Sequence, residues 1–414
     1  MNVTLTMAWR NLWRNGRRTW LTIAAMIFTN VLLVFLISLQ LGMYDTMIEN
    51  SLRAFSGQMQ VQREGYLDEP RMRETIAGSS AITAMLREQL GIESITQRAQ
   101  GFALASSQER SFGIQLIGVE PAYEPLVSSL PGLLGEGRWL SDSNAEEIVL
   151  GRVLARNLQV QLGDEITLLG SGADGSFAAG LATVVGILDT GLPDADRSIA
   201  QLPLGTFQSI FSMPDQAHAL VFEFPDLNQV PARKSQVETL LSKKQLLAQF
   251  QLAVHDWDAL QPGLRQAIMS DMVSAWFMYG ILIIVVSLSV MNTQLMSVLE
   301  RTREFGIMLA LGIKPGRLGR LVLLETLIMS LLGMFIGIFI GYLLVAWFAH
   351  TGFTFAGMAE AAAKYNMDEY MYPQASLLSL FWGPGTVFIG GMLAAIYPAL
   401  KLQRMHPIEA MRAV

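Results

Sequence analysis

The 414-residue sequence contains no cysteine, and only 15% of its residues are charged. Without cysteine the chain has no disulfide, no thiol nucleophile and no thiolate ligand for a metal. The charged fraction lies well below the ~25% of typical soluble domains. By contrast, 51% of the residues are hydrophobic, and the mean hydropathy is +0.37. The composition therefore predicts a membrane protein.

The signatures of several enzyme classes are also missing. No GxxxxGK[ST] string occurs and no lysine follows a glycine, so we expect no ATP hydrolysis through a P-loop of this chain. No GxSxG elbow is present, which leaves a membrane hydrolase without a motif. The four histidines lack metal-ligand spacing: they are His218, His255, His350 and His406. We expect no catalytic residue, no metal and no cofactor in this chain.

One glycine string imitates a nucleotide motif. Residues 170–175 read GSGADG after an expected strand, and Asp194 follows at a distance that suits a ribose contact. A dinucleotide site needs a helix after the glycines, because the helix N-terminus receives the pyrophosphate. Residues 176–187 are instead rich in small and β-branched types. A hairpin tip is therefore favoured over a nucleotide site.

Four long apolar runs predict transmembrane helices. They occupy residues 19–42, 272–299, 318–348 and 377–400. The first is longer than the ~7–15 residues of a signal-peptide core, so we expect it to be retained. A basic amphipathic helix at 1–18 precedes it and suits an anionic membrane surface. The other expected parts are an outer domain at 43–271, short loops at 300–317 and 349–376, and a tail at 401–414.

Charge is distributed unevenly between these parts. Residues 43–271 hold 28 acidic and 16 basic residues, whereas the rest of the chain holds 7 acidic and 13 basic ones. The basic residues outside the domain cluster at 10–18, 301–320 and 401–412. The positive-inside rule therefore places these segments and both termini in the cytoplasm, and the domain outside. Because the domain has few basic residues, nucleic acid is not an expected partner.

The sequence of the outer domain predicts a mixed α+β fold of two subdomains. Strands are expected at 57–63, within 101–118, at both ends of 147–169, at 183–188 and at 219–224, and helices at 79–90, 207–211 and 229–250. Helical extensions at 43–55 and 260–270 suggest a stalk between the domain and the first two spans.

Residues 300–313, ERTREFGIMLALGI, predict a short amphipathic helix between the second and third spans. The charged residues of its first turn are Glu300, Arg301, Arg303 and Glu304, and the apolar residues at helical spacing are Phe305, Met308, Leu309 and Leu311. Gly312 and Pro315 mark the end of the helix. Such a helix either lies along the membrane surface or is held by another protein.

The third and fourth spans contain further signals. Glu325 lies about one turn inside the third span, where an ion pair with Arg320 or an arginine of 300–313 is favoured over a proton relay. Small residues recur every fourth position at Gly333, Gly337 and Gly341, and again at Gly390 and Ala394. This spacing predicts close packing of the third span on the fourth.

Residues 300–312, E-R-T-R-E-F-G-I-M-L-A-L-G, resemble the coupling helix of FtsX-like permeases, the transmembrane subunits of MacB-type ABC transporters. Residues 114–121, 148–168 and 184–199 are similar to the outer domain of LolC/LolE-type lipoprotein-release permeases, and residues 398–412 to the family's C-terminal signature. The resemblance implies an α-helical membrane protein with four transmembrane helices and a large α+β periplasmic domain inserted between the first and second spans.

The resemblance also implies a role and partners. It implies a permease of the bacterial inner membrane that pairs with a second copy or a paralogue. Two copies of a cytoplasmic ABC ATPase would bind ATP and Mg and hydrolyse the ATP. A periplasmic carrier or adaptor could dock outside. The cargo would be a lipid, a lipoprotein or another amphiphile. The implied ATPase contact consists of Glu300, Arg301, Arg303, Glu304, Phe305, Gly306, Leu309, Leu311 and Gly312.

Helical spacing gives a candidate apolar groove for the cargo on the first two spans, made of Phe28, Leu32, Phe35, Leu39, Met278, Ile281 and Val285. One departure concerns the carrier. In the lipoprotein-release subunit that recruits the carrier, the corresponding hairpin contains proline and basic residues, whereas residues 168–182 contain neither. The departure argues against recruitment of a carrier through this hairpin. The alternative function is an FtsX-like signalling module that regulates a periplasmic partner. The large domain favours transport over that alternative.

Overall fold

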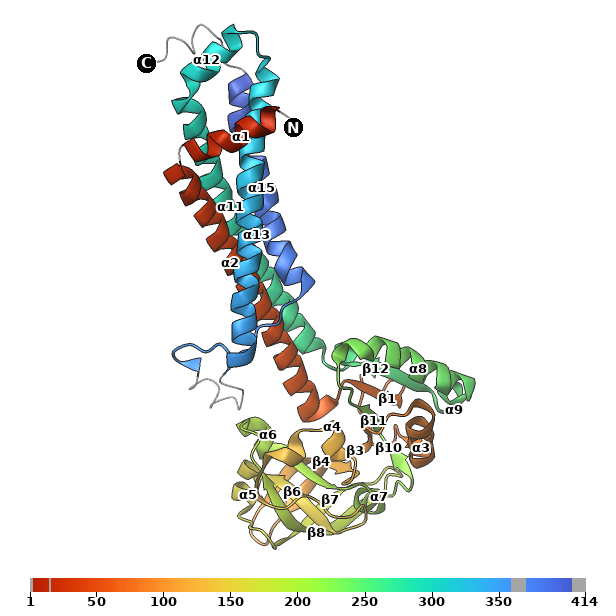
Figure 1. The fold of residues 1–414 in the computed structure, drawn as a ribbon. Helices are drawn as coiled ribbons and strands as arrows, with labels where there is room; N and C mark the ends of the chain where they lie inside the picture. The colour runs from red at the N-terminus through yellow and green to blue at the C-terminus, as the bar shows by residue number, and fades with distance from the viewer. Residues whose placement is uncertain (1–2, 15, 359–369, 404–414) are drawn as a thin grey trace. The chain divides into compact units, whose positions relative to one another are not determined.

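The computed structural model describes residues 3–14, 16–358 and 370–403. The expected tail beyond Gln403, with His406, lies outside the described residues. The chain divides into a helical unit and a domain unit, coloured along the chain in Figure 1. The helical unit comprises Met1–Asp45, Ala267–Phe355 and Tyr370–Val414, and the domain unit comprises Thr46–Gln266 and Ala356–Glu369.

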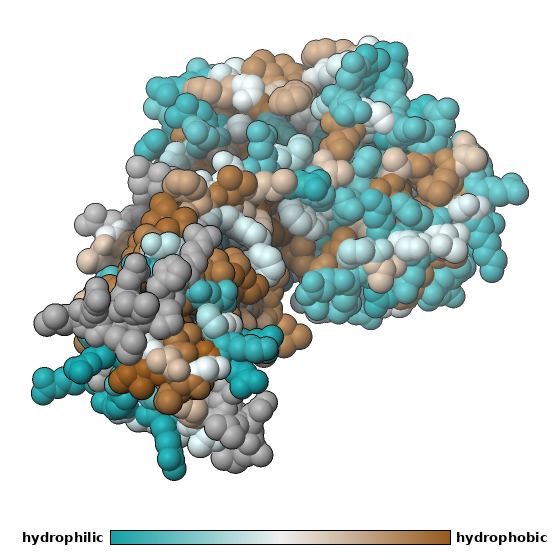
Figure 2. Space-filling view, turned by 90° about the horizontal axis from the view of Figure 1, so that it is seen from above, coloured by the Kyte–Doolittle hydropathy of each residue, from teal (hydrophilic) through white to brown (hydrophobic). Residues whose placement is uncertain are grey.

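The helical unit is built from long apolar helices. Its helices are α1 (Val3–Arg14), α2 (Gly16–Ser51), α11 (Pro262–Glu300), α12 (Thr302–Ala310), α13 (Pro315–Thr351) and α15 (Leu377–Gln403). Within the described residues, α2, α11, α13 and α15 are long and apolar enough to cross a membrane. They leave many apolar side chains on the outside of the bundle, as Figure 2 shows in brown. Such surfaces are typical of helices that face lipid.

Helices α2 and α11 pack directly on each other. Thr22 Oγ1 donates to Thr293 Oγ1 at 3.2 Å, and Tyr279 donates its hydroxyl proton to Gln40 Oε1 at 2.9 Å. Between these polar contacts lies an apolar cluster that includes Met26, Leu33, Val286, Val290 and Val387. The two helices are therefore in contact from Thr22 and Thr293 to Gln40 and Tyr279.

The expected close packing of α13 on α15 is confirmed, but the glycine strip of α13 itself faces α2. A Cβ at Gly333 would lie 2.7 Å from Met26 Cβ, and one at Gly337 would lie 2.5 Å from Asn30 Cβ. Gly341 faces Val34 in the same way. Asn30 Nδ2 also donates to the Gly333 carbonyl at 3.2 Å, so the close approach admits an interhelical hydrogen bond.

The small residues of α15 have different neighbours. A Cβ at Gly390 would lie 2.5 Å from Ser287 Oγ of α11, whereas one at Gly391 would lie 3.3 Å from Ser330 Oγ of α13. Ala394 is only half-buried. The spacing identified the narrow faces correctly, but it carried no information about which helix each face would meet.

The domain unit contains a ten-stranded mixed sheet. Its path is β12-β1-β11-β3-β4-β9-β6-β8-β5, and β7 pairs with β3 and β8. The strands are β1 (Met59–Arg63), β3 (Ile95–Ser106), β4 (Ser111–Val119), β5 (Leu134–Gly137), β6 (Glu147–Gly151), β7 (Glu165–Ser171), β8 (Phe177–Leu188), β9 (Ile199–Pro203), β11 (Ala219–Phe222) and β12 (Leu252–Asp256). A separate two-stranded sheet pairs β2 (Ile76–Ala77) with β10 (Gln216–Ala217).

Short helices cover this sheet. They are α3 (Ser79–Leu90), α4 (Glu124–Val127), α5 (Arg152–Leu158), α6 (Pro193–Ser198), α7 (Leu204–Ile210), α8 (Val230–Lys243), α9 (Leu246–Phe250) and α10 (Trp257–Leu260), with single turns of other helix types at Leu52–Ser56, Leu130–Leu133 and Leu227–Gln229. Buried residues of α5 and α7 pack in one large core cluster, and those of α3 and α8 in another. This arrangement, with the domain between α2 and α11, confirms the expected fold class.

Two local expectations have clear outcomes. Strands β7 and β8 pair antiparallel with Ser171 opposite Phe177, so the GSGADG string is a hairpin tip and no helix follows its glycines. The single helix expected at 229–250 is wrong, because it breaks between α8 and α9. The break lies at Gln245, whose φ of 63° is a left-handed conformation that a continuous helix cannot contain.

Candidate functional site

The short helix α12 is anchored in the helical unit through one face. Helix α11 ends at Glu300, and Arg301 turns the chain so that its carbonyl accepts from Phe305 N at 3.0 Å. The Phe305 side chain is fully buried. It lies in a cluster with Ala8, Val298, Leu318, Leu321, Val322 and Leu402, which come from α1, α11, α13 and α15. One turn of α12 is therefore part of the bundle core.

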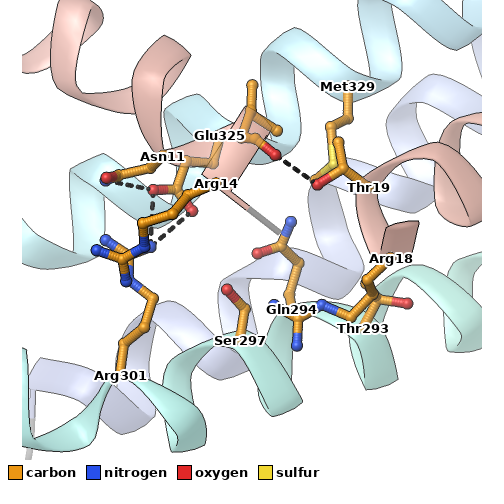
Figure 3. A pocket seen from close by; sticks show the side chains of 11 residues that line it. Asn11, Arg14, Arg18, Thr19, Thr293, Gln294, Ser297, Arg301, Glu325 and Met329 are labelled. Carbon is orange, nitrogen blue, oxygen red and sulfur yellow. Dashed lines mark hydrogen bonds and ion pairs between the residues drawn. The ribbon is translucent and has the colours of Figure 1, made fainter. Parts of the chain in front are cut away.

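A buried ion pair lies beside this anchor. Arg301 Nη1 donates to both carboxylate oxygens of Glu325, at 3.0 and 3.4 Å, and the two side chains are only 8% and 6% exposed. Asn11 of α1 donates its Nδ2 proton to Glu325 Oε1 at 2.9 Å (Figure 3). The expected pairing of Glu325 with an arginine of 300–313 is confirmed, and Arg320 is exposed instead. Three helices thus meet at one carboxylate.

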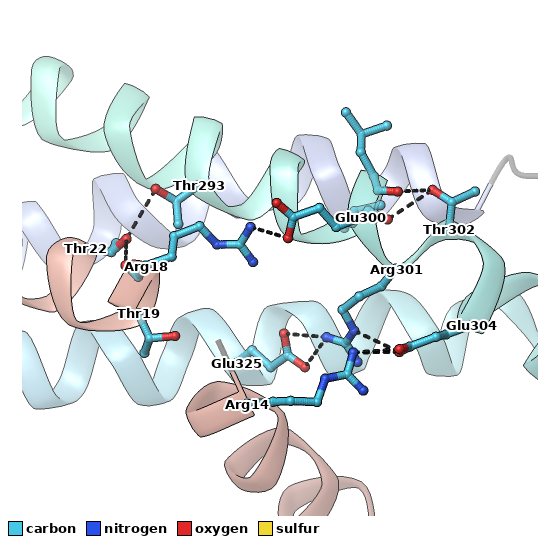
Figure 4. Close-up of polar contacts among 12 residues, drawn as sticks. Arg14, Arg18, Thr19, Thr22, Thr293, Glu300, Arg301, Thr302, Glu304 and Glu325 are labelled. Atoms are coloured by element: carbon cyan, nitrogen blue, oxygen red, sulfur yellow. Dashed lines mark hydrogen bonds and ion pairs between the residues drawn. The ribbon is translucent and has the colours of Figure 1, made fainter. Parts of the chain in front are cut away.

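Two exposed ion pairs extend the cluster (Figure 4). Arg14 Nη2 donates to both oxygens of Glu304 at 2.8 Å, and Arg18 Nη1 donates to Glu300 Oε2 at 2.7 Å. The hydrogen bond from Arg14 is the main reason why the pKa of the Glu304 carboxyl is lowered. Exposed pairs of this kind are individually weak. Together, however, they join α1 to α12 and α2 to the end of α11, and the buried pair joins the start of α12 to α13.

A polar pocket lies between these side chains. It is lined by Asn11, Leu12, Arg14, Arg18, Thr19, Thr293, Gln294, Ser297, Arg301, Glu325 and Met329 (Figure 3). Its cavity volume of ≈ 20 Å³ suits about one water molecule. A substrate does not fit there. The polar side chains of the cluster instead bond to one another, through the Arg301–Glu325 pair and the Asn11–Glu325 hydrogen bond.

The opposite face of α12 is open. Ile307 is 49% exposed and Leu311 is 79% exposed, and both follow the exposed Arg303 at intervals of four residues. The expectation that Leu311 shares a face with Phe305 is wrong, because Leu311 follows Ile307 by four residues and its N–H still donates to the Ile307 carbonyl, so it lies on the exposed face. Ile307 was missing from the expected contact set. Its spacing from Arg303 was the signal that could have revealed it.

The expected coupling residues thus divide between two faces and two helices. Arg301, Phe305 and Gly306 are buried, Leu309 is half-buried, Arg303, Glu304, Leu311 and Gly312 are exposed, and Glu300 belongs to the end of α11. Only the exposed residues are available to a second protein. The buried ones hold α12 to the bundle.

The residues of the expected groove are not all on one open surface. Phe28 of α2 is 67% exposed, and Met278, Ile281 and Val285 of α11 are also exposed, whereas Leu32 and Leu39 are half-buried. The Phe35 ring instead packs on Phe348 and Phe353, with centroids 5.6 and 5.3 Å away, so it faces the end of α13. Phe35 was misplaced because helical spacing cannot tell a lipid-facing residue from one that packs on another apolar helix.

Comparison with known proteins gives two family matches. Residues 19–240 match the MacB-like periplasmic core domain, and residues 276–407 match the FtsX-like permease C-terminal domain. The chain is 22% identical over 330 residues to the macrolide export ATP-binding/permease protein MacB of Bdellovibrio bacteriovorus, which covers 78% of this chain and 47% of that protein. It therefore spans about half the length of this relative.

Two further likenesses were found. The chain is 21% identical over 328 residues to the lipoprotein-releasing system transmembrane protein LolC of Neisseria meningitidis serogroup B, with 75% of each chain covered. The periplasmic region of MacB from Actinobacillus actinomycetemcomitans aligns with 52% of this chain and 96% of its own, with a TM-score of 0.39 and 20% identity. On the two family matches, the chain belongs to the family of ABC transporter permeases that combine a MacB-like periplasmic core domain with an FtsX-like permease domain.

Proposed function

We propose that the chain is the permease subunit of a MacB/LolC-type ABC transporter in the bacterial inner membrane. Two permeases and two copies of a cytoplasmic ATPase, which binds ATP and Mg, form the working complex. ATP hydrolysis moves the periplasmic domains and thereby extracts or exports a lipid, a lipoprotein or another amphiphile. The observation that carries the proposal is that α12 has two different faces. Its locked face, with Phe305 and the adjoining Arg301, is buried in the bundle, and its open face, with Arg303, Ile307 and Leu311, is exposed.

The locked face supports transmission of force. Phe305 of α12 is packed in the bundle core, and Arg301 at the start of α12 is paired with Glu325 of α13, which also accepts a hydrogen bond from Asn11 of α1. A displacement of α12 therefore also displaces α13 and α1. Separating the buried pair would leave a charge without a counter-ion, which costs about 3–5 kcal/mol. Helices α1, α12 and α13 therefore move together as a rigid body when ATP hydrolysis displaces α12.

The open face supports docking of the ATPase. Arg303, Ile307 and Leu311 form a small apolar strip with one cation at its edge. Interfaces between proteins are anchored by such apolar residues surrounded by polar ones. The exposed apolar residues of α11, with Phe28 of α2, are the surface that supports contact with the acyl chains of a cargo.

Native mass spectrometry of the tagged chain, extracted gently from its host membrane, tests this proposal. We expect a complex of two permeases and two ATPase copies that carries an additional mass of acyl-chain type. A complex with an ATPase and a periplasmic enzyme but no amphiphile would support the signalling alternative. A chain that carries no ATPase at all would contradict the proposal.

A further inference from the structure

Helix α1 has an aromatic outer face. Trp9, Trp13 and Trp20 are 47%, 38% and 53% exposed. Their rings form a continuous row, since Trp9 and Trp13 lie 5.6 Å apart between centroids and so do Trp13 and Trp20. The row runs from α1 onto the first turns of α2. Exposed tryptophans are typical of the boundary between lipid tails and headgroups.

Two arginines beside these tryptophans in the sequence carry positive charge that no described residue neutralises. Arg10 and Arg17 are exposed, and neither forms an ion pair with a described residue. No acidic residue occurs before Asp45 in the sequence. In contrast, the neighbouring Arg14 and Arg18 are each paired with a glutamate. These two cations therefore neighbour the tryptophans in the sequence, whereas Arg14 and Arg18 line the polar pocket.

The inner face of α1 belongs to the coupling machinery. Ala8 and Leu12 are buried against the bundle, in the clusters that contain Phe305 and Met329. From this helix Asn11 reaches Glu325, and Arg14 reaches Glu304 of α12. Whatever fixes the outer face of α1 therefore also fixes two contacts that position α12.

We infer that the outer surface formed by Trp9, Arg10 and Trp13 of α1 with Arg17 and Trp20 of α2 binds anionic phospholipid headgroups of the cytoplasmic leaflet, and that this contact stabilises the position of α12. The inference rests on the cytoplasmic orientation in the proposed function. Charge complementarity identifies the ligand, because guanidinium groups bind phosphate oxygens and juxtamembrane cations are attracted to anionic leaflets. The three rings place the helix at headgroup depth, which a soluble protein partner would not require.

The test compares nanodiscs of phosphatidylcholine with nanodiscs that also contain phosphatidylglycerol. The readout is amide hydrogen exchange of residues 3–14 and 302–311 in the purified full chain, which needs no ATPase. We expect phosphatidylglycerol to slow exchange in both segments several-fold. The variant Arg10→Gln/Arg17→Gln should lose this response. The control Lys314→Gln/Arg317→Gln removes the same charge from exposed positions at the start of α13 and should keep it.

Each other outcome overturns the inference. An unchanged response in the α1 variant would show that the lipid acts elsewhere, and an equal loss in the control would show an effect of net charge alone. No response in the native chain, with protection appearing only when an ATPase is added, would make the face a protein contact. Because the lipid readout is independent of the ATPase, failure of the proposed function would leave a positive result in place.

Discussion

Replacing Arg301 by methionine is expected to lower the free energy of unfolding by about 3–5 kcal/mol. The change leaves the Glu325 carboxylate buried with only Asn11 as a donor, since the two paired side chains are 8% and 6% exposed. Burying a charge without a counter-ion is among the largest single costs in a protein interior. The shift is measured as the thermal midpoint of the purified chain in detergent.

Two further variants separate the buried pair from its surroundings. Glu304→Gln breaks the exposed pair with Arg14 and should cost about 1 kcal/mol or less. The double variant Arg301→Met/Glu325→Met should recover much of the lost stability, because apolar side chains often replace a buried pair without net cost. Recovery will be partial, since Asn11 loses its acceptor. A loss for Glu304→Gln as large as for Arg301→Met would contradict the account.

The double variant Ile307→Glu/Leu311→Glu is expected to weaken binding of the ATPase about tenfold or more. Each apolar side chain that an interface buries contributes about 1.5–3 kcal/mol, and 1.4 kcal/mol corresponds to a factor of ten. Both side chains are exposed in the chain itself, so its thermal midpoint should change little. Binding of the purified ATPase and its stimulated ATP hydrolysis are the quantities to measure.

Arg303→Glu should act in the same direction, because Arg303 begins the same exposed strip. The matched control is Arg317→Glu, which reverses a charge at an exposed position of α13 outside that strip. It should leave ATP hydrolysis unchanged. Full stimulation in the α12 variants would remove α12 from the proposed role, and equal losses in the control would indicate a general effect of charge.

Sequence reasoning succeeded where local chemistry allowed one solution. An acid inside an apolar run needs a cation, and the arginines of 300–313 were among the few within reach of Glu325. The hairpin at 170–175 was also predictable, because small and β-branched residues after the glycines favour a strand over a helix. The four spans followed from length and apolar content alone.

Sequence reasoning failed where the answer depends on which elements meet. The glycine spacing predicted that α13 packs closely on α15, which it does, but it could not show that the glycines themselves face α2. Phe35 has the spacing of a lipid-facing residue, yet the segment after α13 brings Phe353 onto it. Neither of these outcomes is encoded in a window of neighbouring residues.

The absence of cysteine permits the most direct measurement of the central claim, which is that α12 receives the ATPase. A single cysteine at Leu311 is coupled to a short thiol-to-amine cross-linker in membranes that contain both proteins, beside a control with the cysteine at the exposed Thr239 of α8. The account predicts a cross-link from position 311 to the ATPase and none from position 239. An assembled complex that gives no cross-link from 311 would contradict it.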